Sequence, residues 1–271
     1  MAEGISKRNN VTVFGKGSRA FVFAHGFGCD QHMWRYLTPA FEDDYRIILF
    51  DYVGAGKSDI SAYDSERYST LEGYAQDVLE VLRELDLKDV IFAGHSVSSI
   101  IGALAWLEEP ERFSHLIMVA PSPCYLNQLP DYVGGFERAD IDGLLDLMDK
   151  NFLGWAGFLA PMVMQNSDKP ELTGELEESF CSTDPVAAGE FAKATFLSDY
   201  RHVLPEVSVP SLILQCSDDV IAPVGVGDYM HERLPCSELR RMKATGHCPH
   251  VSHPDETINL IRDYLSSAVH E

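Results

Sequence analysis

One serine in this chain has the surroundings of a catalytic nucleophile. The segment Gly-His-Ser-Val-Ser places Ser96 directly after the apolar run Val90 to Ala93 and before an apolar, helix-like stretch. A sharp strand-to-helix turn holds a serine hydroxyl above the end of a sheet, and it needs small neighbours because the backbone there is crowded. Gly94 is one such neighbour, and Ser98, where the usual pattern has a second glycine, is also small. The pattern predicts that Ser96 attacks acyl groups.

A serine hydroxyl is a weak nucleophile, so it needs a base and an acid, in the chain order Ser, Asp, His. His247 lies in a loop just after the run Leu239 to Met242, where its imidazole can reach across the sheet end, and we take it as the base. The acid should follow the run Leu212 to Leu214, where Asp218 and Asp219 are adjacent. Neighbouring side chains at a strand end point in different directions, so only one of the two holds the imidazole.

Acyl transfer also needs two hydrogen-bond donors aimed at the developing oxyanion. The backbone N–H of Val97 is one candidate, because it directly follows the nucleophile and begins a helix. The backbone N–H of Phe27 is the other, because the glycines at 26 and 28 let the chain turn tightly after the apolar run Phe21 to Ala24.

Two other kinds of site are weaker interpretations of this sequence. Cys248, His250 and His253 lie close together, but their spacing matches no common zinc pattern, so we expect no metal. The segment Gly-Ala-Gly-Lys-Ser ending at Ser58 lacks the first glycine of a phosphate-binding loop, and no helix pattern begins there. We expect neither nucleotide binding nor any cofactor.

Seven short β-branched or aromatic runs are typical of strands, and several are apolar on both faces, as in a mostly parallel sheet covered on both sides. They are Val11 to Val13, Phe21 to Ala24, Ile47 to Phe50, Val90 to Ala93, Leu116 to Val119, Leu212 to Leu214 and Leu239 to Met242. A helical stripe lies between Ser69 and Leu87, with Ser69 and Glu72 at capping-box spacing, and a last helix begins near Pro254. The fold class is therefore α/β.

Residues 124–204 interrupt this alternation with helix-like patterns and no convincing strand, which predicts an inserted helical cap. The core would then comprise residues 1–123 and 205–271. From Glu137 to Asp184 there are eleven acidic and three basic residues. A solvated helix surface is the simpler interpretation of this excess, and an acidic docking face is the alternative.

Composition excludes several function classes. The 271 residues carry a formal net charge of −21, which repels phosphate backbones and anionic lipid surfaces, so we expect no nucleic-acid or membrane partner. No apolar run is long enough to span a membrane, and the segment 1–10 lacks the apolar stretch of a signal peptide. The six cysteines include no CxxC pair. We therefore expect a cytoplasmic protein with reduced thiols.

Together these features resemble the α/β-hydrolase superfamily. Within it the chain is similar, over nearly its whole length, to the RsbQ-like family of bacterial stress regulators and, more distantly, to plant karrikin and strigolactone receptors. The segments that carry this resemblance are residues 23–31, 121–127, 134–137, 180–185 and 246–250. The cysteine-bearing segment 180–185 favours the RsbQ-like side, whereas Ser98 is similar to the plant receptors.

The resemblance implies an α/β-hydrolase fold, with a mostly parallel sheet of the eight-stranded type and a four-helix cap over an apolar pocket. The family's acid precedes the loop proline by four residues, which selects Asp219 rather than Asp218 because the proline here is Pro223. Matching pocket positions are Phe27, Tyr125, Phe136, Trp155, Leu159 and Phe196.

Three functions fit these observations. The first is an RsbQ-like signalling hydrolase that senses a small apolar ester or lactone and passes the result to a partner phosphatase. The second is a metabolic carboxylesterase. The third is a ligand-binding protein with a vestigial triad, which the complete set of Ser96, Asp219 and His247 disfavours.

Overall fold

The structure, a computed structural model, describes residues 4–268. The first three residues of the segment 1–10 and the last three of the predicted core therefore lie outside it. Among the described residues, no helix is both long enough and apolar enough to cross a membrane.

The apolar runs form one sheet of seven strands in the order β1-β3-β2-β4-β5-β6-β7. The strands are β1 (Thr12–Phe14), β2 (Ala20–Ala24), β3 (Arg46–Leu49), β4 (Val90–His95), β5 (Phe113–Val119), β6 (Ser211–Gln215) and β7 (Ser237–Arg241). Only β1 is antiparallel to its neighbour; all other pairs are parallel. Residues 4–268 thus form the expected mostly parallel sheet with seven strands, one fewer than the eight-stranded type, and the segment before β1 forms the short helix α1 (Ile5–Arg8).

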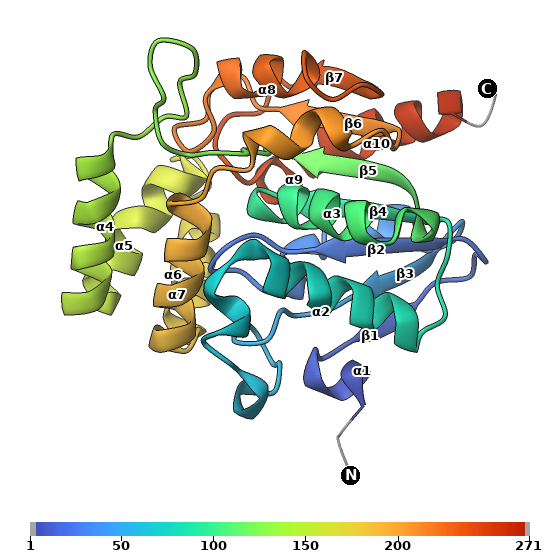
Figure 1. The fold of residues 1–271 in the computed structure, drawn as a ribbon, viewed down its shortest axis with the longest axis horizontal. Coiled ribbons are helices and arrows are strands. Elements are labelled where there is room, and N and C mark those ends of the chain that lie inside the picture. Colours follow the sequence, from blue (N-terminus) through green and yellow to red (C-terminus); the bar gives the residue numbers. More distant parts are fainter. Residues whose placement is uncertain (1–3, 269–271) are drawn as a thin grey trace.

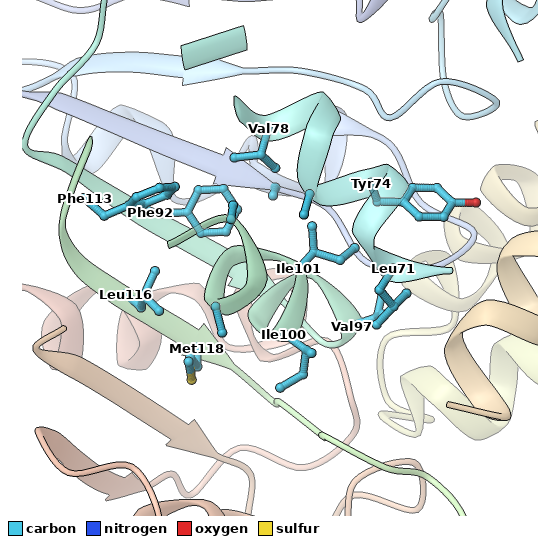
Figure 2. Close-up of a cluster of buried hydrophobic side chains, with 14 of the residues drawn as sticks. Leu71, Tyr74, Val78, Phe92, Val97, Ile100, Ile101, Phe113, Leu116 and Met118 are labelled. Carbon is cyan, nitrogen blue, oxygen red and sulfur yellow. The ribbon is translucent and has the colours of Figure 1, made fainter. Parts of the chain in front are cut away.

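Both faces of the sheet are covered, which explains why its central strands are apolar throughout. The helices α2 (Leu71–Glu84) and α3 (Val97–Glu108) pack on one face, where α3 residues such as Ile101 lie between β4 and α2 (Figure 2). The opposite face holds Phe21, Phe23 and Trp34 together with residues of α10 (Pro254–Ala268). The sheet is therefore the middle layer of three.

The start of α2 differs from its prediction. Thr70 rather than Ser69 is the N-cap residue, and no side chain caps the helix. Ser69 donates its hydroxyl to the Glu66 carbonyl, while the Glu72 carboxylate accepts the Tyr200 hydroxyl at 2.8 Å. The predicted capping box is wrong because both of its side chains are engaged by other partners.

Four helices lie between β5 and β6 and gather beside the carboxyl ends of the central strands (Figure 1). They are α4 (Arg138–Lys150), α5 (Phe152–Met164), α6 (Pro170–Ser182) and α7 (Pro185–Phe196). Asp184 is the N-cap residue of α7, where its carboxylate accepts the N–H groups of Val186 and Ala187. These helices share a buried apolar cluster with the loops at the strand ends. The domain limits at residues 124 and 204 remain a prediction.

The rest of the chain after β6 adds two shorter helices. The helix α8 (Val224–His231) lies between β6 and β7, and α9 (Pro249–Ser252) lies between β7 and α10. The loops that precede α8 and α9 contain Asp219 and His247, so the end of the sheet that faces the four helices also carries the candidate site.

Candidate active site

Ser96 occupies a strained turn between β4 and α3. Its backbone dihedrals are φ 55° and ψ −123°, in the region that non-glycine residues rarely adopt. The turn is too crowded for a side chain at Gly94, where a Cβ would lie 2.4 Å from the Ser98 carbonyl oxygen. The Ser96 N–H donates to the Val119 carbonyl at 2.8 Å, which fixes the turn to the end of β5.

Three side chains from distant segments form one hydrogen-bonded chain. The Ser96 Oγ lies 2.7 Å from His247 Nε2, and His247 Nδ1 lies 2.7 Å from Asp219 Oδ2. The carboxylate can only accept, so Nδ1 carries the hydrogen and Nε2 is left to accept the serine proton. All three side chains are buried. This is the arrangement that a serine nucleophile requires.

The two adjacent carboxylates, Asp218 and Asp219, have different surroundings in the structure. Asp219 Oδ1 accepts the N–H groups of Ile221 and Ala222 at 2.8 and 3.1 Å, which orients Oδ2 toward His247. Asp218 is exposed and contacts Gln165 at 3.4 Å. Only Asp219 is therefore placed to hold the imidazole.

A second hydroxyl contacts the nucleophile. The Tyr125 hydroxyl lies 3.0 Å from Ser96 Oγ. When the serine proton is donated to His247, Tyr125 must be the donor of this bond. Burial raises the pKa of Tyr125, which keeps it protonated. The sequence predicts Tyr125 only as a residue of the pocket wall, because no local pattern shows where its hydroxyl points.

The two predicted oxyanion donors come from different segments: Val97 from the start of α3, and Phe27 from the loop after β2. Val97 is the first residue of α3, where an N–H has no acceptor within the helix. Phe27 lines the same cavity as Ser96. The loop before Phe27 is held by His25, whose Nε2 accepts the Tyr52 N–H at 3.2 Å and whose Nδ1 faces the Gly26 carbonyl at 2.8 Å.

Ser98 has a definite role where the usual pattern has glycine. Its hydroxyl donates to the His25 carbonyl and lies 2.9 Å from the Tyr52 hydroxyl. The side chain therefore ties the nucleophile turn to the loop that carries the Phe27 amide. A glycine at this position could not make that connection.

Two further histidines lie behind His247. His95 Nε2 lies 2.8 Å from the His247 carbonyl, so it donates there and holds the backbone of the base. The centroid of the His250 ring lies 4.3 Å from that of the His95 ring and 4.6 Å from that of the Trp34 ring. Burial lowers the pKa of both histidines, that of His250 to about 3. They therefore stay neutral near His247.

The His247 loop is also bonded to the cap helices. The His247 N–H donates to the Val163 carbonyl at 2.8 Å, near the C-terminus of α5. Asn166 donates to the carbonyls of both Met164 and Thr245. Gly246 has φ +80°, and a Cβ there would lie 2.2 Å from the Met164 carbonyl oxygen. The backbone of the His247 loop is therefore in direct contact with the backbone at the end of α5.

A small cavity of about 30 Å³ lies over Ser96. Of the predicted lining residues, Phe27, Tyr125, Leu159 and Phe196 lie in its wall. The other two predicted residues lie outside the wall of this cavity. Trp155 packs behind Phe27 and Phe180, at 5.9 and 5.2 Å between ring centroids, and Phe136 faces a surface groove on the other side of Phe196. The lining residues that sequence analysis missed are Cys29, His95, Val163, Leu176, Phe180, Thr195, Ile221 and Cys248.

The structure also shows the surroundings of the glycine segment that ends at Ser58 and tests for a metal site. The glycine segment before Ser58 wraps around the Asp51 carboxylate, which accepts the Lys57 N–H at 2.9 Å. A carboxylate of the chain therefore occupies the concavity that a phosphate would need. Within residues 4–268, no three His, Cys, Asp or Glu side chains converge in a way that could hold a metal ion.

Comparisons with known proteins agree with this geometry. A family model described as "Alpha/beta hydrolase family" matches residues 21–260. The karrikin insensitive 2 receptor CA of Petunia hybrida is 40% identical over 262 residues, covering 96% of this chain and 97% of the receptor. The strigolactone esterase D14 of Arabidopsis thaliana is 35% identical over 257 residues, covering 94% and 96%. The solved structure of a hydrolase from Oleispira antarctica is 50% identical, with a TM-score of 0.95, covering 97% of this chain and 96% of that chain.

The buried His250 predicts acid sensitivity. Its pKa falls from 6.5 to about 3 on folding, so between these values only the unfolded chain binds the proton, and stability is lost as the pH falls. We expect His250→Phe to make the dependence of unfolding free energy on pH shallower between pH 6 and 4, by about 1 kcal/mol per pH unit. Urea denaturation at several pH values measures the slope separately from any constant packing change. His202→Gln, at an exposed position, is the control, and equal slopes for His250→Phe and the wild type would contradict this assignment.

Proposed function

The chain belongs to the alpha/beta hydrolase family, and from this premise we propose that it is a serine hydrolase that acts on a small apolar ester or lactone. The observation that supports this best is the continuous hydrogen-bonded chain from Ser96 through His247 to Asp219 at the floor of a cavity. Nucleophile, base, acid and oxyanion donors all come from the chain itself. The proposed reaction therefore uses no cofactor.

In the first half of the proposed reaction, Ser96 Oγ bonds to the substrate carbonyl carbon while its proton moves to His247 Nε2. The negative charge that develops on the carbonyl oxygen is stabilised by the N–H groups of Phe27 and Val97. Asp219 stabilises the imidazolium. His247 then gives the proton to the leaving oxygen, the carbon–oxygen bond breaks, and Ser96 is left acylated. For a lactone, the new hydroxyl stays attached to the acyl group.

In the second half, His247 takes a proton from water, and the resulting oxygen nucleophile attacks the acyl carbon. The bond to Ser96 Oγ breaks, and His247 returns the proton to the serine. In the structure without substrate, the Tyr125 hydroxyl lies within hydrogen-bond distance of Ser96 Oγ. It therefore keeps the serine oxygen oriented when no substrate is bound.

The cavity supports a small neutral substrate. Its wall is mostly apolar and contains no Lys, Arg, Asp or Glu side chain to pair with a charged ligand. Relatives named karrikin receptors and strigolactone esterases support a lactone or ester within this class.

Receptor-named relatives also support a sensing role, so we propose a cytoplasmic, RsbQ-like signalling hydrolase ahead of a general metabolic carboxylesterase. A pure binding protein is the less favoured alternative. It would not need the complete proton path that joins Ser96 to Asp219.

The nucleophile is tested by Ser96→Ala. We expect turnover of short neutral esters to fall at least about 1,000-fold, because no other group can form the acyl intermediate. The melting temperature should change little, since Ser96 contributes little packing. Intact-mass measurement after brief exposure to lactones and esters should show an acyl adduct on the wild type and none on the variant. Ser217→Ala is the matched control, and wild-type turnover by Ser96→Ala would exclude the proposed reaction.

The acid is tested by comparing two neighbouring substitutions. Asp219→Asn should lower kcat about 1,000-fold or more, because an amide can donate to His247 Nδ1 and favour the wrong imidazole tautomer. Asp218→Asn should stay within about 3-fold of the wild type, as expected for an exposed side chain outside the site. The reverse ranking of kcat would overturn the assignment of the acid without affecting that of Ser96.

A surface groove favours a second activity, docking of a protein partner. The groove lies between α4 and α5 and is lined by Phe136, Ala139, Leu144, Leu147, Phe158, Met162 and Val220. The Phe158 side chain is 52% exposed, which is unusual for a large apolar residue. Exposed acidic side chains lie along α4, where Asp142 and Asp146 form ion pairs with Arg138 and Lys150. We propose that a partner with an apolar, basic-rimmed surface binds here, with a phosphatase as the first candidate.

Charge reversal tests this docking. Replacing three α4 acids by lysine should slow association about 10-fold at low salt without changing ester turnover, because surface charge guides encounter. The three positions are Asp142, Asp146 and Asp149. Surface capture of a phosphatase encoded alongside this protein, at low and high salt, measures the rate. The control reverses three exposed acids away from the cap, namely Asp43, Asp44 and Glu108. Association that ignores salt and both reversals would favour the plain esterase.

A further inference from the structure

A buried hydroxyl in the cavity wall has no partner in the described chain. Thr195 lies near the C-terminus of α7 and is 1% exposed. Its Oγ1 makes no hydrogen bond with any residue from 4 to 268. A helical threonine usually satisfies this group by donating to a carbonyl in the preceding turn. Because buried hydroxyl groups are almost always paired, the exception here needs a reason.

The place of Thr195 suggests the reason. It lines the cavity over Ser96, and the next residue, Phe196, packs against Tyr125 and Phe27 at 5.2 and 5.5 Å between ring centroids. The end of α7 is therefore seated over the reacting serine. A group bound in the cavity can meet both Ser96 and the wall that contains Thr195.

Most other strong polar groups in the cavity wall already have partners. Ser96, His247 and Tyr125 bond to one another. His95 uses Nε2 for the His247 carbonyl, and its unpaired Nδ1 faces Gly26, where a Cβ would lie within 2.5 Å of it. Thr195 is thus the hydroxyl of the cavity wall that has no partner among residues 4–268, and the other wall residues from α5, α6 and α7 are apolar.

We propose that Thr195 is a specificity-determining residue that binds a second oxygen of the substrate. This inference rests on the proposed hydrolase function and narrows its substrate class. The preferred ester or lactone carries an ether, carbonyl or hydroxyl oxygen apart from the carbonyl that Ser96 attacks. A hydrocarbon chain at the same place leaves the hydroxyl unpaired, so the site discriminates against it.

Two variants isolate the hydroxyl. Thr195→Val keeps the shape and removes the oxygen, whereas Thr195→Ser keeps the oxygen and loses a methyl group. The substrates are two matched pairs in which one methylene is replaced by an ether oxygen. On the acyl side they are the 4-methylumbelliferyl esters of butyrate and methoxyacetate. On the alcohol side they are pentyl acetate and 2-ethoxyethyl acetate.

The quantity measured is the ratio of kcat/KM for the oxygen-containing ester to that for its hydrocarbon partner. Dividing each variant's ratio by the wild-type ratio removes the intrinsic reactivity of the esters. We expect Thr195→Val to lower this ratio about 10-fold in at least one pair, and Thr195→Ser to change it less than about 2-fold. Thr183→Val, a cap threonine whose Oγ1 donates to the Ser179 carbonyl, is the control and should leave the ratio unchanged.

Different results would overturn the two proposals. If the wild type hydrolyses the esters but Thr195→Val keeps both ratios, the Thr195 hydroxyl takes no part in recognition. This inference is then overturned, and the proposed hydrolase function stands. If the wild type hydrolyses none of the four esters, the proposed hydrolase function fails, and the inference that rests on it fails too. Melting curves of both variants confirm that each ratio comes from a folded protein.

Discussion

The positive φ of Ser96 is the constraint on which the site depends, because the backbone conformation fixes the direction in which the Cα–Cβ bond leaves the turn. Such a backbone conformation is unfavourable for serine and persists only where its surroundings allow no alternative. Here the absence of a side chain at Gly94 and the bond from the Ser96 N–H to Val119 impose it. The hydrogen bonds of Ser96 Oγ with His247 and Tyr125 then hold the hydroxyl in one orientation.

The two buried histidines behind His247 are uncharged, and this suits the charge that the proposed reaction places on His247. An imidazolium that forms on His247 is stabilised by Asp219 and would be destabilised by any cation nearby. The His95 ring packs against His247 and the His250 ring packs against His95, yet burial lowers the pKa of both histidines and keeps them uncharged. They can therefore fill space and orient the backbone of the base without opposing its protonation. Ser98 provides the corresponding neutral support on the oxyanion side.

Local pattern was sufficient for the features that depend on local chemistry. The seven strands follow from β-branched runs, and Ser96 and His247 follow from glycine turns at strand ends. Features that depend on how separate elements pack were not predictable. The rotation of the cap helices decides that Leu159 reaches the cavity while Trp155 lies behind it, and it turns Thr195 inward. Residues alone also left Asp218 and Asp219 equivalent, since the amides that orient Asp219 act through tertiary geometry.

The hydrogen bond between Val163 and His247 makes the base a shared part of two structural units. Its imidazole serves the reaction centre, while its amide caps a carbonyl near the end of α5, which would otherwise lack a partner. Any shift of that helix end must either carry the base with it or break the bond. A ligand that moved α5 on binding would therefore also act on His247, and by reciprocity a partner that held α5 in that position would raise the affinity for the ligand.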